Sequence, residues 1–369
     1  MIRFDRNELS GAFGDIGTDL PLLVGMILAA GLNAGSVLIT YGLLQVATAL
    51  VYGIPMPVQP LKAVATLVIA QKIAGPVVYG AGLAIGLVML LLTLTGLLEW
   101  LANRIPRAVV RGIQFGLGLQ LSLLALTSYV SSGGVTGFIL AAAAFAVTVA
   151  LMGNRRFPPA LPVIGLGVVY ATIAHYDPVA LASSFGLSFP SFAVPAPGDI
   201  GTGLVLLALP QIPLSFGNSI LATQRIAADY FPERHITVPR IGLTYSLMNI
   251  AAPFFGGVPV CHGSGGMAGH YAFGARTGGS VVIYGAMYII LGLCFGSGFT
   301  SLIRVFPLPV LGVILLFEGA ALIRLLADMV PMKRHFGIAV LVGLLCVGLP
   351  YGYLVGLVIG TVLARVRNE

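Results

Sequence analysis

The chain has 369 residues, of which 58% are apolar and only 8% are charged, with 19 Lys and Arg against 12 Asp and Glu. An average soluble domain carries roughly 25% charged residues, so this composition excludes a soluble enzyme or a disordered chain and makes the lipid bilayer the main solvent. The net charge of +7 is scattered along the chain rather than gathered into one basic face, which excludes a nucleic-acid partner.

Apolar stretches follow one another along almost the whole chain. The first ten residues are polar, so no cleavable signal peptide is expected. Most stretches approach the roughly 20 residues that cross a hydrocarbon core, but the third and the tenth are shorter. Together they predict an all-α integral membrane protein with about 14 transmembrane segments, at 10–30, 34–53, 58–73, 76–98, 108–130, 134–152, 160–175, 200–224, 238–256, 262–273, 279–297, 300–323, 335–349 and 350–366.

The basic residues indicate the orientation of these segments. If the N-terminus is cytoplasmic, 16 of the 19 Lys and Arg fall at the termini or in even-numbered loops, whereas 176–198, predicted outside, contains none. Only Lys62, Lys72 and Arg304 depart from this pattern. We therefore expect an even number of spans in the cell (inner) membrane, with both termini cytoplasmic. The 16 residues are Arg3, Arg6, Arg104, Arg107, Arg111, Arg155, Arg156, Arg225, Arg234, Arg240, Arg276, Arg324, Lys333, Arg334, Arg365 and Arg367.

The two halves of the chain look like copies of each other. The segment 54–59 (IPMPVQ) leads into the short third span, and 257–261 (GVPVC) leads into the short tenth. Seven spans per half is an odd number, so we expect inverted repeats at 1–175 and 200–369, joined by an extracytoplasmic connection at 176–199. Proline and glycine are common in transmembrane helices, but breaks at matching places in inverted halves indicate a transporter's substrate site.

The two short helices predict an anion site. Their N-termini, after Val58 and after Cys261, would face each other near the bilayer midplane. Each offers unpaired backbone N–H groups and the positive end of a helix dipole. The glycine-rich run 263–266 (GSGG) would let a ligand approach closely and would add a hydroxyl donor.

Four charged residues lie in or beside apolar spans, where each unpaired charge costs at least about 3 kcal/mol. Asp15 and Asp19 are four residues apart and share one helix face, and Lys62 lies on the third span. An Asp–Lys ion pair between the first and third spans and a direct role in coupling or gating both remain open. For Glu318, proton relay and structural hydrogen bonding remain open. No metal site, cofactor or disulfide framework is expected.

Four segments resemble the signatures of the molybdate transporter family, a branch of the sulfate permease superfamily. They are 11–21 (GAFGDIGTDLP), 57–63 (PVQPLKA), 209–214 (LPQIPL) with Asn218 and Ser219, and 261–266 (CHGSGG). Leu61 stands where the family has methionine. The resemblance implies a seven-plus-seven inverted repeat, as in uracil permease and the sulfate permeases, with core and gate domains. It is compatible with a homodimer, and the few residues after the last span imply no C-terminal soluble domain.

The resemblance also implies a secondary active transporter that imports molybdate by alternating access, with the substrate between the third and tenth helices. Proton symport is the working hypothesis, with Asp15, Asp19, Lys62 and Glu318 as coupling or gating candidates. Asp19 is the preferred proton carrier, because it lies deeper in the first span and close to Pro21. The expected substrate-binding residues are Val58, Gln59, Gln211, Ser215, Asn218, Cys261, His262, Gly263, Ser264 and Gly265.

Three alternatives remain. The same fold could carry sulfate, tungstate, another oxyanion or a nucleobase, and sulfate and molybdate differ mainly in size. A membrane enzyme would need a nucleophile–base pair or a metal cluster, and the sequence contains no such pattern. A passive channel is disfavoured, because broken helices around a substrate-sized site suit alternating access.

Overall fold

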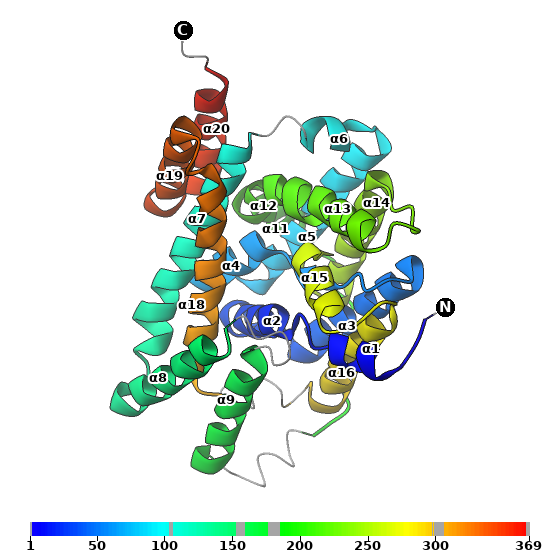
Figure 1. Cartoon of the computed structure of the whole chain (residues 1–369), viewed down its shortest axis with the longest axis vertical. Coiled ribbons are helices and arrows are strands. Elements are labelled where there is room, and N and C mark those ends of the chain that lie inside the picture. The colour runs from blue at the N-terminus through cyan, green and yellow to red at the C-terminus, as the bar shows by residue number, and fades with distance from the viewer. Residues whose placement is uncertain are drawn as a thin grey trace.

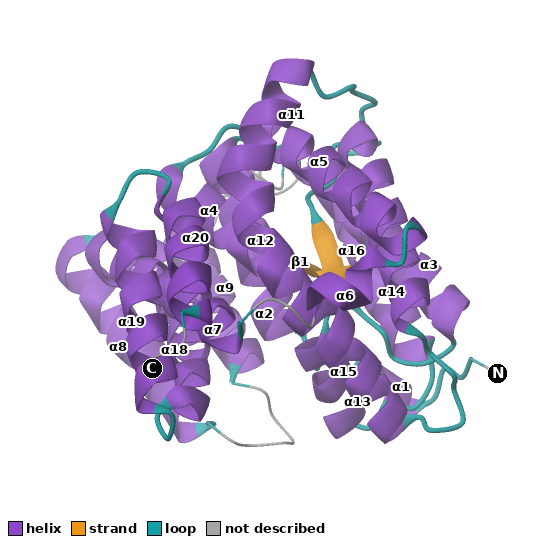
Figure 2. Cartoon of the chain, turned by 90° about the horizontal axis from the view of Figure 1, so that it is seen from above, coloured by secondary structure: helices purple, strands orange, loops and turns teal. Residues whose placement is uncertain are grey.

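The computed structural model describes residues 2–102, 106–152, 159–175, 185–296, 298 and 306–366. Within this part, nearly all of the regular structure is helical, and the helices form two bundles that lie side by side (Figures 1 and 2). Both bundles take helices from both halves of the chain. Part of the predicted connection, 176–184, and five of the basic residues used for the orientation lie outside the described residues: Arg104, Arg155, Arg156, Arg304 and Arg367.

The first bundle, called the large bundle here, is built around the packing of α3 on α16 and of α5 on α14. A pair of short strands lies inside it (Figure 2). Its elements are α1 (Arg6–Gly11), α2 (Ile16–Ala30), α3 (Ala34–Tyr52), β1 (Val58–Pro60), α4 (Lys62–Gln71), α5 (Gly75–Leu94), α6 (Leu97–Ala102), α11 (Pro197–Gly203), η2 (Leu204–Ala208), α12 (Leu209–Leu214), η3 (Ser215–Leu221), α13 (Ala222–Tyr230), α14 (Val238–Ala251), η4 (Ala252–Phe255), β2 (Val260–His262), α15 (Ser264–Ala272) and α16 (Gly279–Phe295).

The second bundle, called the small bundle, packs α7 against α18 and α19. Gly112 and Gly116 of α7 make this possible, because a side chain at Gly112 would meet Ala339 and Val342 of α19, and one at Gly116 would meet Cys346. Its elements are α7 (Arg107–Leu124), η1 (Ala125–Val130), α8 (Gly134–Ala150), α9 (Ala160–His175), α18 (Leu308–Arg324), η5 (Leu325–Met329), α19 (Lys333–Gly348) and α20 (Gly352–Arg365).

Few of the predicted spans are single long helices. Among the described residues, four helical stretches are long and apolar enough to cross a membrane, and a fifth is counted if the bent pair Pro197–Leu214 and Ser219–Tyr230 is one span. The shorter apolar helices, such as α8, fall below that length. The count of 14 spans and the inverted repeat therefore stay predictions. The four stretches are Ala34–Tyr52, Gly75–Leu94, Arg107–Val130 and Leu308–Met329.

The predicted span at 200–224 is part of an irregular helical run that begins at Pro197 and ends at Tyr230. Two π-helical segments, η2 and η3, flank the one α-helical piece that contains Pro210 and Pro213. Proline lacks the N–H that an α-helix needs and clashes with the preceding turn, so the chain widens locally on both sides of these residues.

The two short helices expected from the Pro-Val segments are present as α4 and α15. They begin at Lys62 and Ser264 rather than directly after Val58 and Cys261, because those two residues lie in the short strands β1 and β2. The strands β1 and β2 pair antiparallel, with Gln59 opposite Cys261. The Leu61 N–H bonds to the Pro259 carbonyl and the Gly263 N–H to the Pro57 carbonyl, which extends the ladder at both ends. This pairing satisfies backbone groups that would otherwise be unpaired inside an apolar protein.

Two amide side chains complete the strand pair on its outer edges. Gln45 of α3 accepts from the Val58 N–H at 2.8 Å and donates to the Val58 carbonyl at 2.7 Å. Asn249 of α14 does the same for Val260, at 2.9 and 2.7 Å. Both amides are fully buried and replace a neighbouring strand, so the two strand–helix units are built alike down to their supporting side chains.

Candidate functional site

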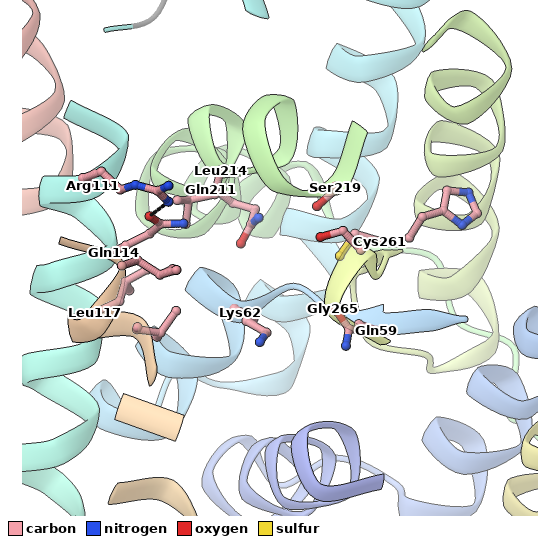
Figure 3. Close-up of a pocket in the computed structure, with 14 residues that line it drawn as sticks. Gln59, Lys62, Arg111, Gln114, Leu117, Gln211, Leu214, Ser219, Cys261 and Gly265 are labelled. Atoms are coloured by element: carbon pink, nitrogen blue, oxygen red, sulfur yellow. Dashed lines mark hydrogen bonds between the residues drawn. The ribbon is translucent and has the colours of Figure 1, made fainter. Parts of the chain in front are cut away.

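A cavity of about 340 Å³ lies where the two bundles meet, beside the starts of α4 and α15. Figure 3 shows Arg111, Gln114 and Leu117 of α7 on one side and Gln59, Cys261 and Gly265 of the large bundle on the other, with Lys62 between them. The lining residues are Gln59, Lys62, Arg111, Gln114, Leu117, Gln211, Leu214, Ser219, Cys261, His262, Ser264, Gly265, Leu322 and Leu325.

The start of α15 is open to this cavity. Its N-cap residue, Gly263, has no side chain to accept from the first turn, so the N–H groups of Ser264, Gly265 and Gly266 have no acceptor within the helix. Ser264 and Gly265 line the cavity, and nothing lies within 4 Å of the position that a Cβ would take at Gly265. The helix therefore presents backbone donors, a hydroxyl and the positive end of its dipole to the cavity.

The carboxylate of Asp15 lies directly against this open end. A Cβ at Gly266 would lie 2.1 Å from Asp15 Oδ2, so only glycine fits there. The Gln59 amide Nε2 donates to both oxygens of Asp15 at 2.7 Å. Asp15 is 4% exposed and, in the described part of the chain, takes part in no salt bridge. The Gln59 amide and the positive end of the α15 dipole both stabilise its negative charge.

The start of α4 is closed by contrast. Gln211 of α12 accepts from the Ala63 N–H at 2.9 Å and so caps this helix from another element. The Gln211 Nε2 donates to Ser215 at 3.2 Å, and the Ser215 hydroxyl bonds to Tyr245 at 2.8 Å. The first residue of α4 adds a charge, because Lys62 lines the cavity and its side chain is 36% exposed.

Glu318 of α18 is the carboxylate partner of Lys62. Their charged atoms are 3.8 Å apart, and Thr18 of α2 donates to the same carboxylate at 3.0 Å. Of the alternatives left open by the sequence, the structure shows no Asp–Lys salt bridge among its described residues, and Lys62 pairs with Glu318 between the bundles. The sequence alone does not predict this ion pair, because Lys62 and Glu318 are far apart in the chain and meet only where the two bundles pack together.

Asp19 lies behind the strands, away from the cavity lining. Its Oδ2 accepts from Tyr284 at 3.1 Å, and its Oδ1 is buried without a hydrogen-bond partner in the described part of the chain. The Tyr41 hydroxyl lies 2.5 Å from both Asp19 Oδ2 and the Val58 carbonyl, which share its single hydrogen. Asp19 thus ties α2 to α3 and α16, whereas Asp15 is hydrogen-bonded to a side chain that lines the cavity, that of Gln59.

Most of the predicted substrate residues surround the cavity, and a few do not. Gln59, Gln211, Cys261, His262, Ser264 and Gly265 line it, and so does Lys62. The imidazole of His262, however, packs edge-on against Tyr52 and bonds to Thr244 at 2.6 Å.

Three of the predicted residues are not among the lining residues. Val58 has both backbone groups bonded to Gln45, Ser215 supports Gln211 from behind, and Gly263 bonds through its N–H to Pro57. The side chain of Asn218 lies outside the described part of the structure, and its neighbour Ser219 lines the cavity.

Sequence reasoning missed the contribution of the small bundle. Arg111 and Gln114 come from α7, and Leu322 and Leu325 from α18 and η5. From the sequence, Arg111 is identified only as a basic loop residue. Gln114 lies one turn later in the same apolar span, and a polar residue at that position could have indicated a site facing the cavity. With these additions the described lining holds two cationic side chains and no carboxylate. Such a cavity can bind a small anion through charge and many donors.

The fold places the chain in a class of solved structures. It matches the transmembrane domain of the cyanobacterium bicarbonate transporter BicA with a TM-score of 0.68 and 18% identity, covering 94% of this chain and 98% of that one. It matches the murine Slc26a9 anion transporter, described in its inward-facing state, with a TM-score of 0.73 and 14% identity, covering 99% of this chain and 68% of that one. The fold is that of a helical, multi-pass membrane transporter.

The family follows from sequence comparison. The profile of the family described as molybdate transporter of MFS superfamily matches residues 7–121 and 203–322. Molybdate transporters 2 and 1 of Arabidopsis thaliana are 34% and 33% identical over 89% and 87% of this chain, which spans 81% and 80% of theirs. The chain belongs to the molybdate transporter family, as its motifs indicate. It is an anion transporter and not an enzyme.

Proposed function

We propose that the protein is a secondary active transporter that imports molybdate by alternating access. The observation that carries this proposal is the cavity itself, which places the open N-terminus of α15 opposite a lysine at the start of α4, without a lining carboxylate. A tetrahedral oxyanion accepts hydrogen bonds on all sides, so it matches donors that converge from several elements. The cargo named for the Arabidopsis relatives supports molybdate among such anions.

The arrangement of the bundles supports alternating access. The cavity lies at their boundary, and α4 and α15 belong to one bundle while α7 and α18 belong to the other. The polar contacts across this boundary include the Lys62–Glu318 pair and the Thr18–Glu318 bond. Movement of one bundle along the other would break these few contacts and expose the site to the opposite side, with the core of each bundle preserved.

We propose that proton symport drives uptake and that Asp15 carries the proton. Accumulating an anion against an inside-negative potential costs about 2.3 kcal/mol per charge per 100 mV, and a co-transported proton would offset part of this cost. Substrate and the Asp15 carboxylate both lie at the N-terminus of α15, where two negative charges repel each other. A proton on Asp15 removes that repulsion, so the anion and the proton bind best together. Asp19, with tyrosine partners away from the cavity, fits this role less well.

Three further features stay predictions from the sequence. They are the cell (inner) membrane as the location, the cytoplasmic position of both termini, and the homodimer. Reaction with a cysteine-specific reagent at introduced terminal cysteines in intact cells tests the orientation.

The test of function is molybdate uptake by the purified protein in proteoliposomes. Ser264→Ala removes one hydroxyl donor from the site, and a hydrogen bond to a charged group is worth roughly 1.5–3 kcal/mol. Half-saturation should therefore rise by one to two decades, whereas Ser131→Ala, at an exposed serine of the small bundle, should change nothing. Absence of molybdate uptake by the unaltered protein overturns the function, and equal half-saturation in both variants removes Ser264 from the site.

A further inference from the structure

Gln114 carries an unusual unsatisfied group. Its side chain is completely buried on α7 and lines the cavity, yet its Nε2 has no hydrogen-bond partner among the described residues. Buried polar groups in native proteins nearly always have partners, so an orphan of this kind indicates a missing ligand or a strained site.

The orientation of the amide is fixed by its neighbour. The Gln114 Oε1 accepts from Arg111 Nη1 at 2.9 Å, and a guanidinium can only donate. A reversed amide would set two donors against each other, so the oxygen must face Arg111 and the Nε2 must face away from it. Two N–H donors therefore remain unsatisfied beside the cavity.

Arg111 is itself held in place. Its Nε and Nη2 both donate to Asp328 Oδ2 of η5, at 2.8 and 2.6 Å. Because the planar guanidinium is bonded to both Asp328 and Gln114, it has little rotational freedom. It therefore holds the Gln114 amide in one orientation. Arg111, Gln114 and Asp328 all belong to the small bundle and move together.

We propose that Gln114 Nε2 binds an oxygen of the transported oxyanion from the small bundle, with Arg111 as its positioning residue. This inference rests on the proposed function and deepens it. The donors at the starts of α4 and α15 bind the anion from the large bundle, so the anion becomes the polar bridge between the bundles. Leu117, Leu322 and Leu325 line the same cavity with apolar side chains.

The experiment measures equilibrium binding of molybdate to purified protein in detergent, together with its thermal unfolding. Gln114→Leu keeps the approximate size of the side chain and removes the donor. We expect molybdate binding at least about tenfold weaker, equal to about 1.4 kcal/mol. The melting temperature without molybdate should change little, because the variant removes an unsatisfied buried N–H group together with the acceptor of Arg111 Nη1, and the Arg111 side chain is partly exposed. The control is Gln120→Leu on the same helix, where Gln120 accepts from Tyr353 outside the cavity.

The outcomes separate the two proposals. If the unaltered protein fails to bind molybdate, the proposed function is wrong. If it binds molybdate and Gln114→Leu binds it equally well, only the role of Gln114 is wrong. A melting temperature that falls with affinity unchanged assigns Gln114 a structural role and also contradicts the inference.

A second variant tests the positioning role of Arg111. Arg111→Lys keeps the positive charge but cannot hold Asp328 and Gln114 at once in the same geometry. It should weaken molybdate binding in the unaltered background and should cause no further loss in the Gln114→Leu background. Equal losses in both backgrounds would show that Arg111 acts independently of Gln114.

Discussion

The starts of α4 and α15 are built on the same plan and present different chemistry to the cavity. Each follows a strand whose outer edge is completed by a buried amide, Gln45 in one case and Asn249 in the other. The start of α4 is capped by Gln211 and carries a lysine, whereas the start of α15 is uncapped and rich in glycine. The start of α4 thus supplies the charge of Lys62, and the start of α15 supplies backbone N–H donors that an anion can approach closely.

This difference assigns separate tasks to the two ends. An anion approaches the backbone closely only where side chains are absent, and the same opening admits the carboxylate of Asp15. In the proposed mechanism, binding and coupling therefore meet at α15. The start of α4 is tied instead to the small bundle through Glu318, and in the same proposal it would link anion binding to bundle movement.

The largest effect is expected from closing the open end. Gly266→Ala places a methyl group in the space of the Asp15 carboxylate, and overpacking of this kind costs about 1–3 kcal/mol. We expect molybdate uptake to be lost in proteoliposomes. The matched control is Gly265→Ala, whose methyl group enters open space in the cavity. It should fold normally and keep part of its uptake, and equal uptake by the two variants would contradict the close approach of Asp15.

The second-largest effect is expected at Asp15, which lies at the same start of α15 and is the proposed proton carrier. Asp15→Asn keeps an acceptor for Gln59 and removes the titratable charge. We expect it to lose accumulation driven by a pH gradient while it keeps counterflow of molybdate. Asp19→Asn should keep more of its gradient-driven accumulation. Full accumulation by both variants removes the aspartates from coupling, and loss of counterflow in Asp15→Asn indicates a structural role.

Substitutions at Lys62 and at its partner Glu318 should change molybdate binding in opposite directions. Lys62→Met removes a charged donor and should weaken molybdate binding about tenfold to a hundredfold. Glu318→Gln releases Lys62 from a partly exposed pair, whose worth of about 0–1 kcal/mol allows binding to tighten up to about fivefold. Titration calorimetry on the two purified variants checks the signs. Changes in the same direction would mean that Lys62 and Glu318 do not compete with substrate in this way.

The smallest effect is expected from opening the closed end. Gln211→Leu removes the cap of α4 and should lower stability by about 1 kcal/mol. Thermal unfolding in detergent measures this against Gln224→Leu, a partly exposed position on α13. If both variants melt at the same temperature, the Gln211–Ala63 bond does not stabilise the start of α4.

The sequence predicted the parts of this site that depend on local patterns. Pro57 and Pro259 broke the apolar stretches at matching places, and both short helices lie where those breaks put them. The supporting amides Gln45 and Asn249 were missed, because one polar residue inside a long apolar helix does not show what it contacts. The Lys62–Glu318 pair and the Arg111–Gln114 pair depend on how the bundles pack. Side-chain spacing along one helix carries no such information.

The central claim is that the anion lies between the starts of α4 and α15, and the most direct measurement locates it. Tungstate has the shape and charge of molybdate and scatters X-rays strongly, so its anomalous signal in crystals of the protein marks the site. The account predicts one dominant peak in the cavity, within hydrogen-bond distance of Ser264 and Gly265 and facing Lys62 and Gln114. A dominant peak elsewhere, for example in the groove beside Arg234 and His235, would contradict it.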